Sequence, residues 1–327
     1  MLCQYIKKGI FRFRQLGGWR LLCAYAKAGV LPTLLNEVAR TIIQRRPLKE
    51  AYPVVTRKIV PMLQTQYRPL VSQLAETYDN ADLEHEKSDV VWFCWLQGLE
   101  HAPELVKVCL ASQQRWVRGK RLVVITAENY REYVTLPADI EQKHDKGIIP
   151  DAHFTDLIRL ELLIKYGGTW IDSTVLFCGG DYPDKIMDCD LFFFQYRNRN
   201  GKEFAGISNW FISAYSNNRL LMILRDMLLQ YWRNYDCLMY YYVFHLFFGL
   251  IAELFPEEIE AMPKANSMRA IQLMQYLELP YDEQLMERLT AISCIHKLDY
   301  RKSRLLTKDQ RPTFYSYIIN HYAKEIE

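Results

Sequence analysis

The sequence predicts an α/β fold, in which a sheet is flanked by helices and preceded by a helical N-terminal region. From residue 88 onward, short apolar strands alternate with amphipathic helices. The chain has 327 residues, half of them apolar, which suffices for one large domain with an appendage. Its net charge of +3 excludes a disordered polyelectrolyte. We therefore expect a helical region at 1–87 and an α/β domain at 88–327.

The N-terminal region is strongly basic. Residues 1–46 carry nine Lys and Arg against the single acid Glu37, so this segment is +8 and the remainder is +3 − 8 = −5. Apolar residues recur at helical spacing within it. Two interpretations stay open: a helical cap packed on the main domain, or a basic amphipathic surface that rests on anionic lipid. Nucleic acid is not expected as a partner, because no motif that reads it accompanies the charge.

The sequence favours a cytoplasmic protein that touches a membrane only peripherally, at its cytoplasmic face. The longest uncharged stretch, 237–252, is shorter than the roughly 20 residues of a spanning helix. No secretory signal is evident at the start. The eight cysteines include no C-x-x-C pair, which favours a reducing compartment over a disulfide scaffold.

The predicted domain begins with a β-α-β unit. Apolar strands are expected at 89–96 and 121–126, and Pro103 stands where a first-turn proline opens the helix between them, to about 116. This order predicts parallel strands with a ligand crevice at their carboxyl ends. Asp151 can cap a helix at 152–165 that ends at Gly167 and Gly168. Further strands are expected at 169–177, 190–196, 206–214 and 290–298, and further helices at 218–232 and 238–254.

Residues 155–177 carry the most informative constellation. Asp156 and Arg159 are three residues apart on the predicted helix, hence on one face. Trp170, Asp172 and Thr174 alternate on the predicted strand, hence also on one face. The two glycines between these elements let backbone approach a ligand.

Each of these features has an ordinary structural interpretation, but that interpretation is least satisfactory for Asp172. The Asp156–Arg159 pair alone would be a surface ion pair, and Trp170 alone would be core. A carboxylate in the middle of an apolar strand, however, costs several kcal/mol unless it has partners. A second D-x-D sequence, at 188–190, precedes an apolar strand without such context and is interpreted as a solvated strand start. Serine-hydrolase elbows and P-loops are absent.

The motifs resemble a known family. Thr-Asp-x-x-Arg at 155–159, followed by Gly-Gly-x-Trp-x-Asp-x-Thr at 167–174, resembles sugar transferases of the family 32 type. The resemblance is closer to bacterial capsular polysaccharide synthesis proteins, through patches at 92–98, 102–105, 146–156, 207–212 and 295–298. It implies a GT-A (Rossmann-like) sheet that binds a nucleotide-sugar.

The resemblance also implies roles for individual residues. Trp95 would stack on the nucleotide base. Asp156 and Arg159 would hold the ribose and the donor sugar, with Trp170 lining the same pocket and Gly168 bringing backbone close to the donor. Asn209 would face the donor sugar and the acceptor.

A divalent cation, Mn²⁺ or Mg²⁺, is implied on the donor diphosphate. Asp172 matches the first carboxylate of the D-x-D motif, and His296 lies where a late metal ligand is often placed. Thr174 replaces the second aspartate and is a weaker ligand. We also expect one or two cations of the basic tail that starts at Lys297, Arg301 among them, to share neutralisation of the leaving group.

The implied function is transfer of a sugar from a nucleotide-sugar donor to a hydroxyl of a glycan or lipid-linked oligosaccharide in capsular or other cell-surface polysaccharide synthesis, with retained configuration. Two alternatives stay open. One is a transferase that glycosylates a protein side chain. The other is a non-catalytic protein that binds a nucleotide-sugar, which Thr174 suggests.

Overall fold

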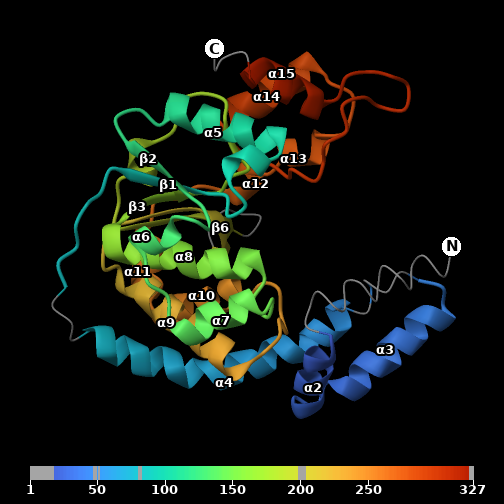
Figure 1. Cartoon of the computed structure of the whole chain (residues 1–327), viewed down its shortest axis with the longest axis vertical. Helices are drawn as coiled ribbons and strands as arrows, with labels where there is room; N and C mark the ends of the chain where they lie inside the picture. The colour runs from blue at the N-terminus through green and yellow to red at the C-terminus, as the bar shows by residue number, and fades with distance from the viewer. Residues whose placement is uncertain (1–17, 47–49, 51, 80–82, 198–203, 324–327) are drawn as a thin grey trace. The chain divides into compact units, whose positions relative to one another are not determined.

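The structure is a computed structural model of the chain, and it describes residues 18–46, 50, 52–79, 83–197 and 204–323 (Figure 1). The chain divides into two compact units, each built from three stretches. The first comprises 1–82, 136–158 and 219–256, and the second comprises 83–135, 159–218 and 257–327.

The first unit is helical. It contains α2 (Trp19–Lys27), α3 (Leu31–Ile43), α4 (Tyr52–Asp79), α7 (Ala138–Asp145), the start of α8 (Asp151–Tyr166), α9 (Arg219–Asn234) and α10 (Val243–Leu254). The long helix α4 buries every fourth residue from Val55 to Val71, which forms an apolar stripe along one side. Tyr67 of this stripe packs on Phe247 of α10, with ring centroids 4.6 Å apart. The predicted helix at 218–232 is confirmed as α9, and the one predicted at 238–254 is α10, which begins five residues later, at Val243.

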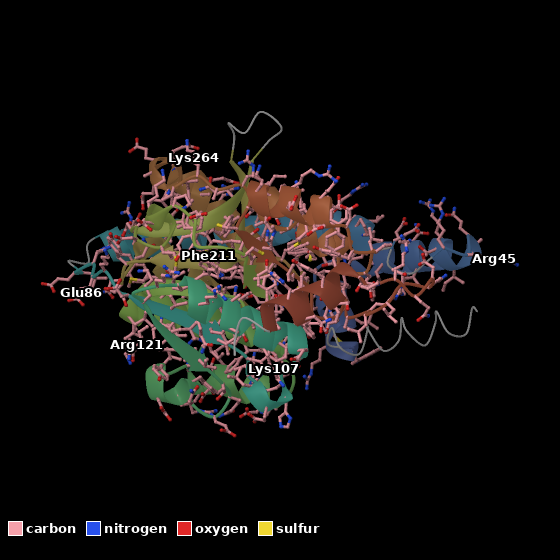
Figure 2. All side chains as sticks on the ribbon, turned by 90° about the horizontal axis from the view of Figure 1, so that it is seen from above. Arg45, Glu86, Lys107, Arg121, Phe211 and Lys264 are labelled. Atoms are coloured by element: carbon pink, nitrogen blue, oxygen red, sulfur yellow. The ribbon has the colours of Figure 1, made fainter. Side chains whose placement is uncertain are left out.

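The second unit contains a five-stranded mixed sheet, which confirms the predicted α/β fold. The strands are β1 (Val90–Cys94), β2 (Arg121–Ile125), β3 (Gly168–Ile171), β5 (Leu191–Arg197) and β6 (Phe204–Ala214), in the order β2-β1-β3-β6-β5. β1 pairs in parallel with both β2 and β3, as the β-α-β pattern predicts. The crossover helix is α5 (Glu104–Trp116). β6 pairs antiparallel with β3 and β5. Phe211 lies within the packed side chains, whereas Lys107, Arg121 and Lys264 project outward (Figure 2).

The predicted strand at 169–177 is wrong in one respect, because it is two strands in two sheets. β3 ends at Ile171, residues 172–174 form a turn, and β4 (Val175–Phe177) follows. β4 pairs antiparallel with β7 (Ile295–Lys297). The predicted late strand at 290–298 is likewise shorter, because α14 (Glu283–Ile292) occupies its first residues. The Asp282 carboxylate starts that helix by accepting from the backbone N–H of Leu285 at 2.7 Å.

Short elements and C-terminal helices complete the second unit: η2 (Leu99–His101), α6 (Tyr130–Tyr133), η3 (Asp184–Ile186), α11 (Pro256–Ala261), α12 (Ser267–Ala270), α13 (Leu273–Tyr276) and α15 (Phe314–Ala323). α5 and α15 pack together with β4 around a buried cluster that includes Leu105, Leu176 and Ile318 (Figure 1). This cluster covers the side of β4 and β7 that carries Leu176.

Gly168 is required by the approach of β3 to β1. Its φ of +92° is costly for other residues, and a Cβ at this position would lie 2.3 Å from the carbonyl oxygen of Val90. The preceding Gly167, with φ of +65°, ends α8 as expected. The two glycines therefore allow β3 to start directly after α8, in contact with β1.

Candidate active site

Asp172 stands in the turn just beyond β3, where the chain passes from the main sheet to the β4–β7 pair. Its backbone N–H donates to the carbonyl oxygen of Trp210 at 2.9 Å. Gln113 of α5 holds the turn from another side, since its amide donates to the carbonyl oxygens of Asp172 at 3.3 Å and Val175 at 2.9 Å. A glutamine among the buried, mostly apolar residues of α5 was the sequence signal for this clamp, and the sequence reasoning missed it.

Three side chains surround the Asp172 carboxylate. The indole Nε1 of Trp170 donates to Oδ1 at 2.9 Å, and Arg159 Nη2 lies 3.4 Å from the same oxygen. Lys297 Nζ lies 3.7 Å from Oδ2. The Asp172 side chain keeps 24% of its surface exposed, so it is anchored and still accessible to a ligand.

Arg159 is buried and contacts two strands of the sheet. Its side chain is 6% exposed, and its Nη1 donates to the carbonyl oxygen of Asn209 on β6 at 2.5 Å. The guanidinium carbon lies 4.7 Å from the centroid of the Trp170 ring, a cation–π distance. The arginine therefore ties α8 to β3 and β6 in one place.

Lys297 occupies the other side of the turn. Its ammonium donates to Thr174 Oγ1 at 2.5 Å and to its neighbour's carbonyl oxygen, that of Leu298, at 3.3 Å. The backbone N–H of Leu298 in turn donates to the Thr174 carbonyl oxygen at 2.8 Å. The structure thus brings together Arg159, Trp170, Asp172, Thr174 and Lys297, which we call the Asp172 cluster.

The remaining predicted residues relate to this cluster in different ways. Asn209 contributes its backbone carbonyl, described above. Asp156 lies one helical turn before Arg159, in the part of α8 that belongs to the first unit, and its carboxylate is 3.7 Å from His153. Trp95 follows β1, half-buried, and makes an edge contact with Tyr300 at 5.4 Å. Its indole N–H has no hydrogen-bond partner among the described residues.

The predicted metal ligands do not form a ligand set for a divalent cation. His296 is fully buried opposite Leu176, and successive side chains of a strand point to opposite sides, so it faces away from Lys297. Burial lowers the pKa of His296 to about 4. In the part of the chain that the structure describes, no three His, Cys, Asp or Glu side chains are grouped as a metal needs.

The charges around Asp172 also oppose a metal. Its carboxylate lies between the guanidinium of Arg159 and the ammonium of Lys297. Two unit charges 4 Å apart interact by about 4 kcal/mol near a protein surface, so the ammonium would repel a divalent cation about as strongly as the Asp172 carboxylate attracts it at the same distance. Thr174 already accepts a hydrogen bond from the same ammonium.

The second D-x-D sequence is on the surface, apart from this arrangement. Asp188 accepts from Lys87 at 2.5 Å and from the hydroxyl of Tyr215 at 3.3 Å. Asp190 is largely exposed and lies 3.2 Å from His85. These are local surface contacts at the start of β5, as expected for a solvated strand start.

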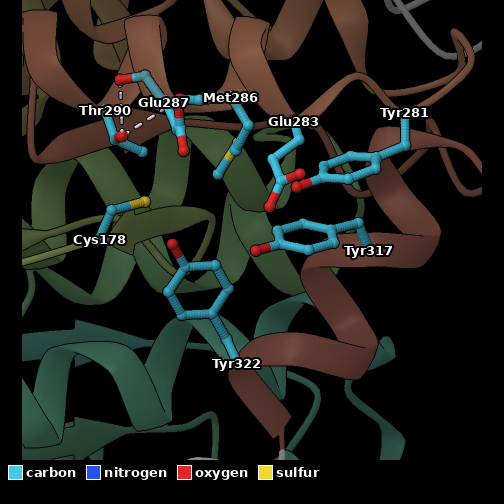
Figure 3. Close-up of a pocket in the computed structure, with 8 residues that line it drawn as sticks. All are labelled: Cys178, Tyr281, Glu283, Met286, Glu287, Thr290, Tyr317 and Tyr322. Carbon is cyan, nitrogen blue, oxygen red and sulfur yellow. Dashed lines mark hydrogen bonds between the residues drawn. The ribbon is translucent and has the colours of Figure 1, made fainter.

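A pocket of about 190 Å³ lies elsewhere in the second unit (Figure 3). It is lined by Cys178, Tyr281, Glu283, Met286, Glu287, Thr290, Tyr317 and Tyr322. The rings of Tyr281 and Tyr317 stack with centroids 4.0 Å apart. None of the residues predicted for the site lines this pocket, so it is separate from the Asp172 cluster.

The chain belongs to the capsular polysaccharide synthesis protein family, whose sequence profile matches residues 40–318. The predicted resemblance to that family is thereby confirmed. The protein is 26% identical over 157 residues to the O-glycosyltransferase PaGT of Phomopsis amygdali, a match that covers 43% of this chain and 38% of PaGT. The chain thus spans about two fifths of the length of that relative.

Among solved structures, the PaToxG glycosyltransferase is similar over 81% of this chain and 95% of its own. The sequence identity is 12% and the TM-score is 0.38.

Proposed function

We propose that the protein is a glycosyltransferase that moves a sugar from a nucleotide-sugar donor to a hydroxyl of a polysaccharide acceptor. Membership of the capsular polysaccharide synthesis family supports this proposal, as does the partial similarity to PaGT. The observation that carries it is the charge of the Asp172 cluster, in which two anchored cations face one carboxylate. A net positive, partly exposed site suits the phosphates of a nucleotide-sugar.

The residues would divide the work as follows. In the reaction, the bond from the anomeric carbon to the diphosphate oxygen breaks, the acceptor oxygen bonds to that carbon, and the hydroxyl proton is released. Arg159 and Lys297 would stabilise the negative charge that the leaving diphosphate gains. Asp172 would stabilise the positive charge that develops on the sugar ring.

The donor would be bound by the other predicted residues. Trp95, half-buried after β1, would stack on the base, and Asp156 would bind the ribose. Asn209 would hold Arg159 through its carbonyl oxygen and face the sugar and acceptor. Retention of configuration belongs to this proposal as well and rests on the family resemblance.

Donor hydrolysis in the absence of acceptor tests this function. The protein is incubated with UDP- and GDP-sugars, and release of nucleoside diphosphate is measured. We expect slow release that falls at least about 100-fold in Asp172→Asn, because the amide keeps the shape and removes the charge. Asp188→Asn is the matched control and should leave the rate unchanged. Equal rates in both variants would contradict the assignment of Asp172.

The same assay separates the alternatives. Tight binding of a nucleotide-sugar without any release would favour a non-catalytic binding protein. If release occurs, transfer of labelled sugar to a glycan or lipid-linked oligosaccharide is compared with transfer to protein. Labelled protein alone would favour a transferase that modifies protein side chains.

We propose that the protein acts at the cytoplasmic face of a membrane, and exposed side chains of α3 support the membrane contact. Leu35, Ile42 and Ile43 of α3 are exposed at spacings that form one apolar stripe, with Ile43 80% exposed. Trp19 of α2 is 76% exposed. Basic side chains accompany these residues: Arg20, Lys27, Arg40, Arg45 and Arg46. The other four of the nine basic residues at 1–46 lie outside the described residues: Lys7, Lys8, Arg12 and Arg14.

An exposed apolar stripe beside cations suits an anionic bilayer surface. No helix among the described residues is long and apolar enough to cross a membrane. We expect stronger flotation with phosphatidylglycerol-containing vesicles than with neutral vesicles, falling as salt is raised. Ile43→Ser should weaken that binding, whereas Leu279→Ser, an exposed leucine of the second unit, should not. Equal binding to neutral and anionic vesicles would contradict electrostatic docking.

A further inference from the structure

We propose that Lys297 takes the place of the divalent cation, so that the protein binds and releases the donor diphosphate without a metal. This inference rests on the proposed function and deepens it. The sequence led us to expect that one or two cations of the basic tail neutralise the leaving group, and this inference assigns that role to Lys297.

The position of Lys297 comes from the pairing of two short strands. β7 runs antiparallel to β4 with Lys297 opposite Val175, next to the Asp172–Thr174 turn. Its ammonium is 2.5 Å from Thr174 Oγ1 and 3.7 Å from Asp172 Oδ2. Those two oxygens are the ones that a D-x-D motif would offer to a metal. The ammonium therefore occupies the space between the motif oxygens.

The chemistry of position 174 agrees with this placement. A threonine hydroxyl is neutral and accepts a hydrogen bond from an ammonium, whereas a second carboxylate there would add the charge that a divalent ion needs. With Thr174 present, the cluster counts two cations against one anion, a net charge of +1 before a ligand arrives. The nearby Asp299 interacts electrostatically with Lys297 and is itself paired with Arg301 at 2.9 Å and 3.2 Å.

The Lys297 side chain is fixed by hydrogen bonds and is still accessible to a ligand. Its side chain is 22% exposed. An ammonium carries three N–H groups, and among the described residues two are used, by Thr174 Oγ1 and by the Leu298 carbonyl oxygen. The third makes no hydrogen bond to a described residue, since Asp172 Oδ2 is 3.7 Å away, and it can donate to a phosphate oxygen. Because the charge is covalently fixed, its contribution does not depend on the concentration of a free ion.

The experiment measures the binding of UDP, GDP, uridine and guanosine by calorimetry, in EDTA and again with added Mn²⁺. For the wild-type chain we expect diphosphate affinity to agree within about twofold between the two conditions. Lys297→Met should lose about 10- to 100-fold of the diphosphate affinity, the value of one charge-assisted hydrogen bond. The nucleosides lack phosphate, so their affinity should not change.

Two further variants serve as controls. Lys297→Arg keeps the charge and should retain most of the diphosphate affinity. Lys302→Met removes a lysine of the same tail, whose ammonium donates to the Met274 carbonyl oxygen at 2.8 Å, and should match the wild type. Circular dichroism checks that each variant folds. If Lys297→Met does not fold, the comparison of EDTA with Mn²⁺ on the wild type still decides the question.

The outcomes separate this inference from the proposed function. Diphosphate binding that requires Mn²⁺, or a Lys297→Met variant that binds like the wild type, overturns the role of Lys297 and leaves the transferase proposal standing. A wild-type chain that binds neither UDP nor GDP under either condition overturns the proposed function itself.

Discussion

Arg159→Met should destabilise the protein by about 3 kcal/mol or more. The guanidinium is almost fully buried and donates to the Asn209 carbonyl at 2.5 Å, contacts Asp172 at 3.4 Å and covers the Trp170 ring at 4.7 Å. Breaking a buried pair by removing one partner costs about 3–5 kcal/mol. The lower end of this range applies here, because Asp172 would keep its hydrogen bond from the Trp170 indole and its ion pair with Lys297.

Urea unfolding followed by circular dichroism measures this loss directly, and a thermal scan should show a fall of roughly 6–12 °C. Lys264→Met is the matched control, because Lys264 pairs with Glu260 at 2.8 Å on the surface of the same unit, where such a pair contributes about 0.5 kcal/mol. If the two variants unfold within about 1 kcal/mol of each other, Arg159 does not tie α8 to the sheet as described.

Three further predictions concern stability. Gly168→Ala should cost at least about 2 kcal/mol, because its Cβ would lie 2.3 Å from a backbone oxygen of β1, whereas Gly119→Ala, with φ of +73° and open space around it, should cost only about 1 kcal/mol in the same thermal scan. Burial lowers the pKa of His296 from 6.5 to about 4, so in that pH window the unfolded chain binds a proton that the folded chain does not. The free energy of unfolding should therefore fall as the pH drops from 6.5 to 4, by roughly 3 kcal/mol from this residue, and urea titrations of His296→Leu should show a flatter profile. Tyr78→Phe should lower the urea midpoint by an amount equivalent to about 1–2 kcal/mol, since the hydroxyl donates to Asp226 at 2.5 Å; an unchanged midpoint would mean that this bond contributes nothing.

The elements that the sequence predicted well are those with local signals. The apolar runs of β1 and β2 and the Pro103 start of α5 all reflect residues near each other in the chain. Placing Asp172 in a turn required a different kind of information. β3 and β4 read as one continuous apolar strand, and they separate because β4 pairs with β7 instead of the main sheet.

The same long-range pairing decided which late residue reaches the site. Lys297 and Thr174 are separated by 123 positions in sequence, and only the register of β7 determines whether residue 296 or 297 faces the turn. A shift of one residue would have presented His296 instead. A sequence pattern identifies a basic tail at this point, but the hydrogen-bond register fixes the one side chain that contacts Asp172 and Thr174.

The long helix α4 has a practical consequence for anyone who divides this protein into fragments. Its buried stripe packs with α9 and α10, which come more than 130 residues later in the chain. Deleting the first 87 residues would remove Tyr67, which packs on Phe247, and would expose the apolar surface that α4 covers. It would also remove Arg68, the ion-pair partner of Glu253. Such a fragment should aggregate, and truncations intended to isolate the sheet would do better to keep α4 and shorten the chain before residue 52.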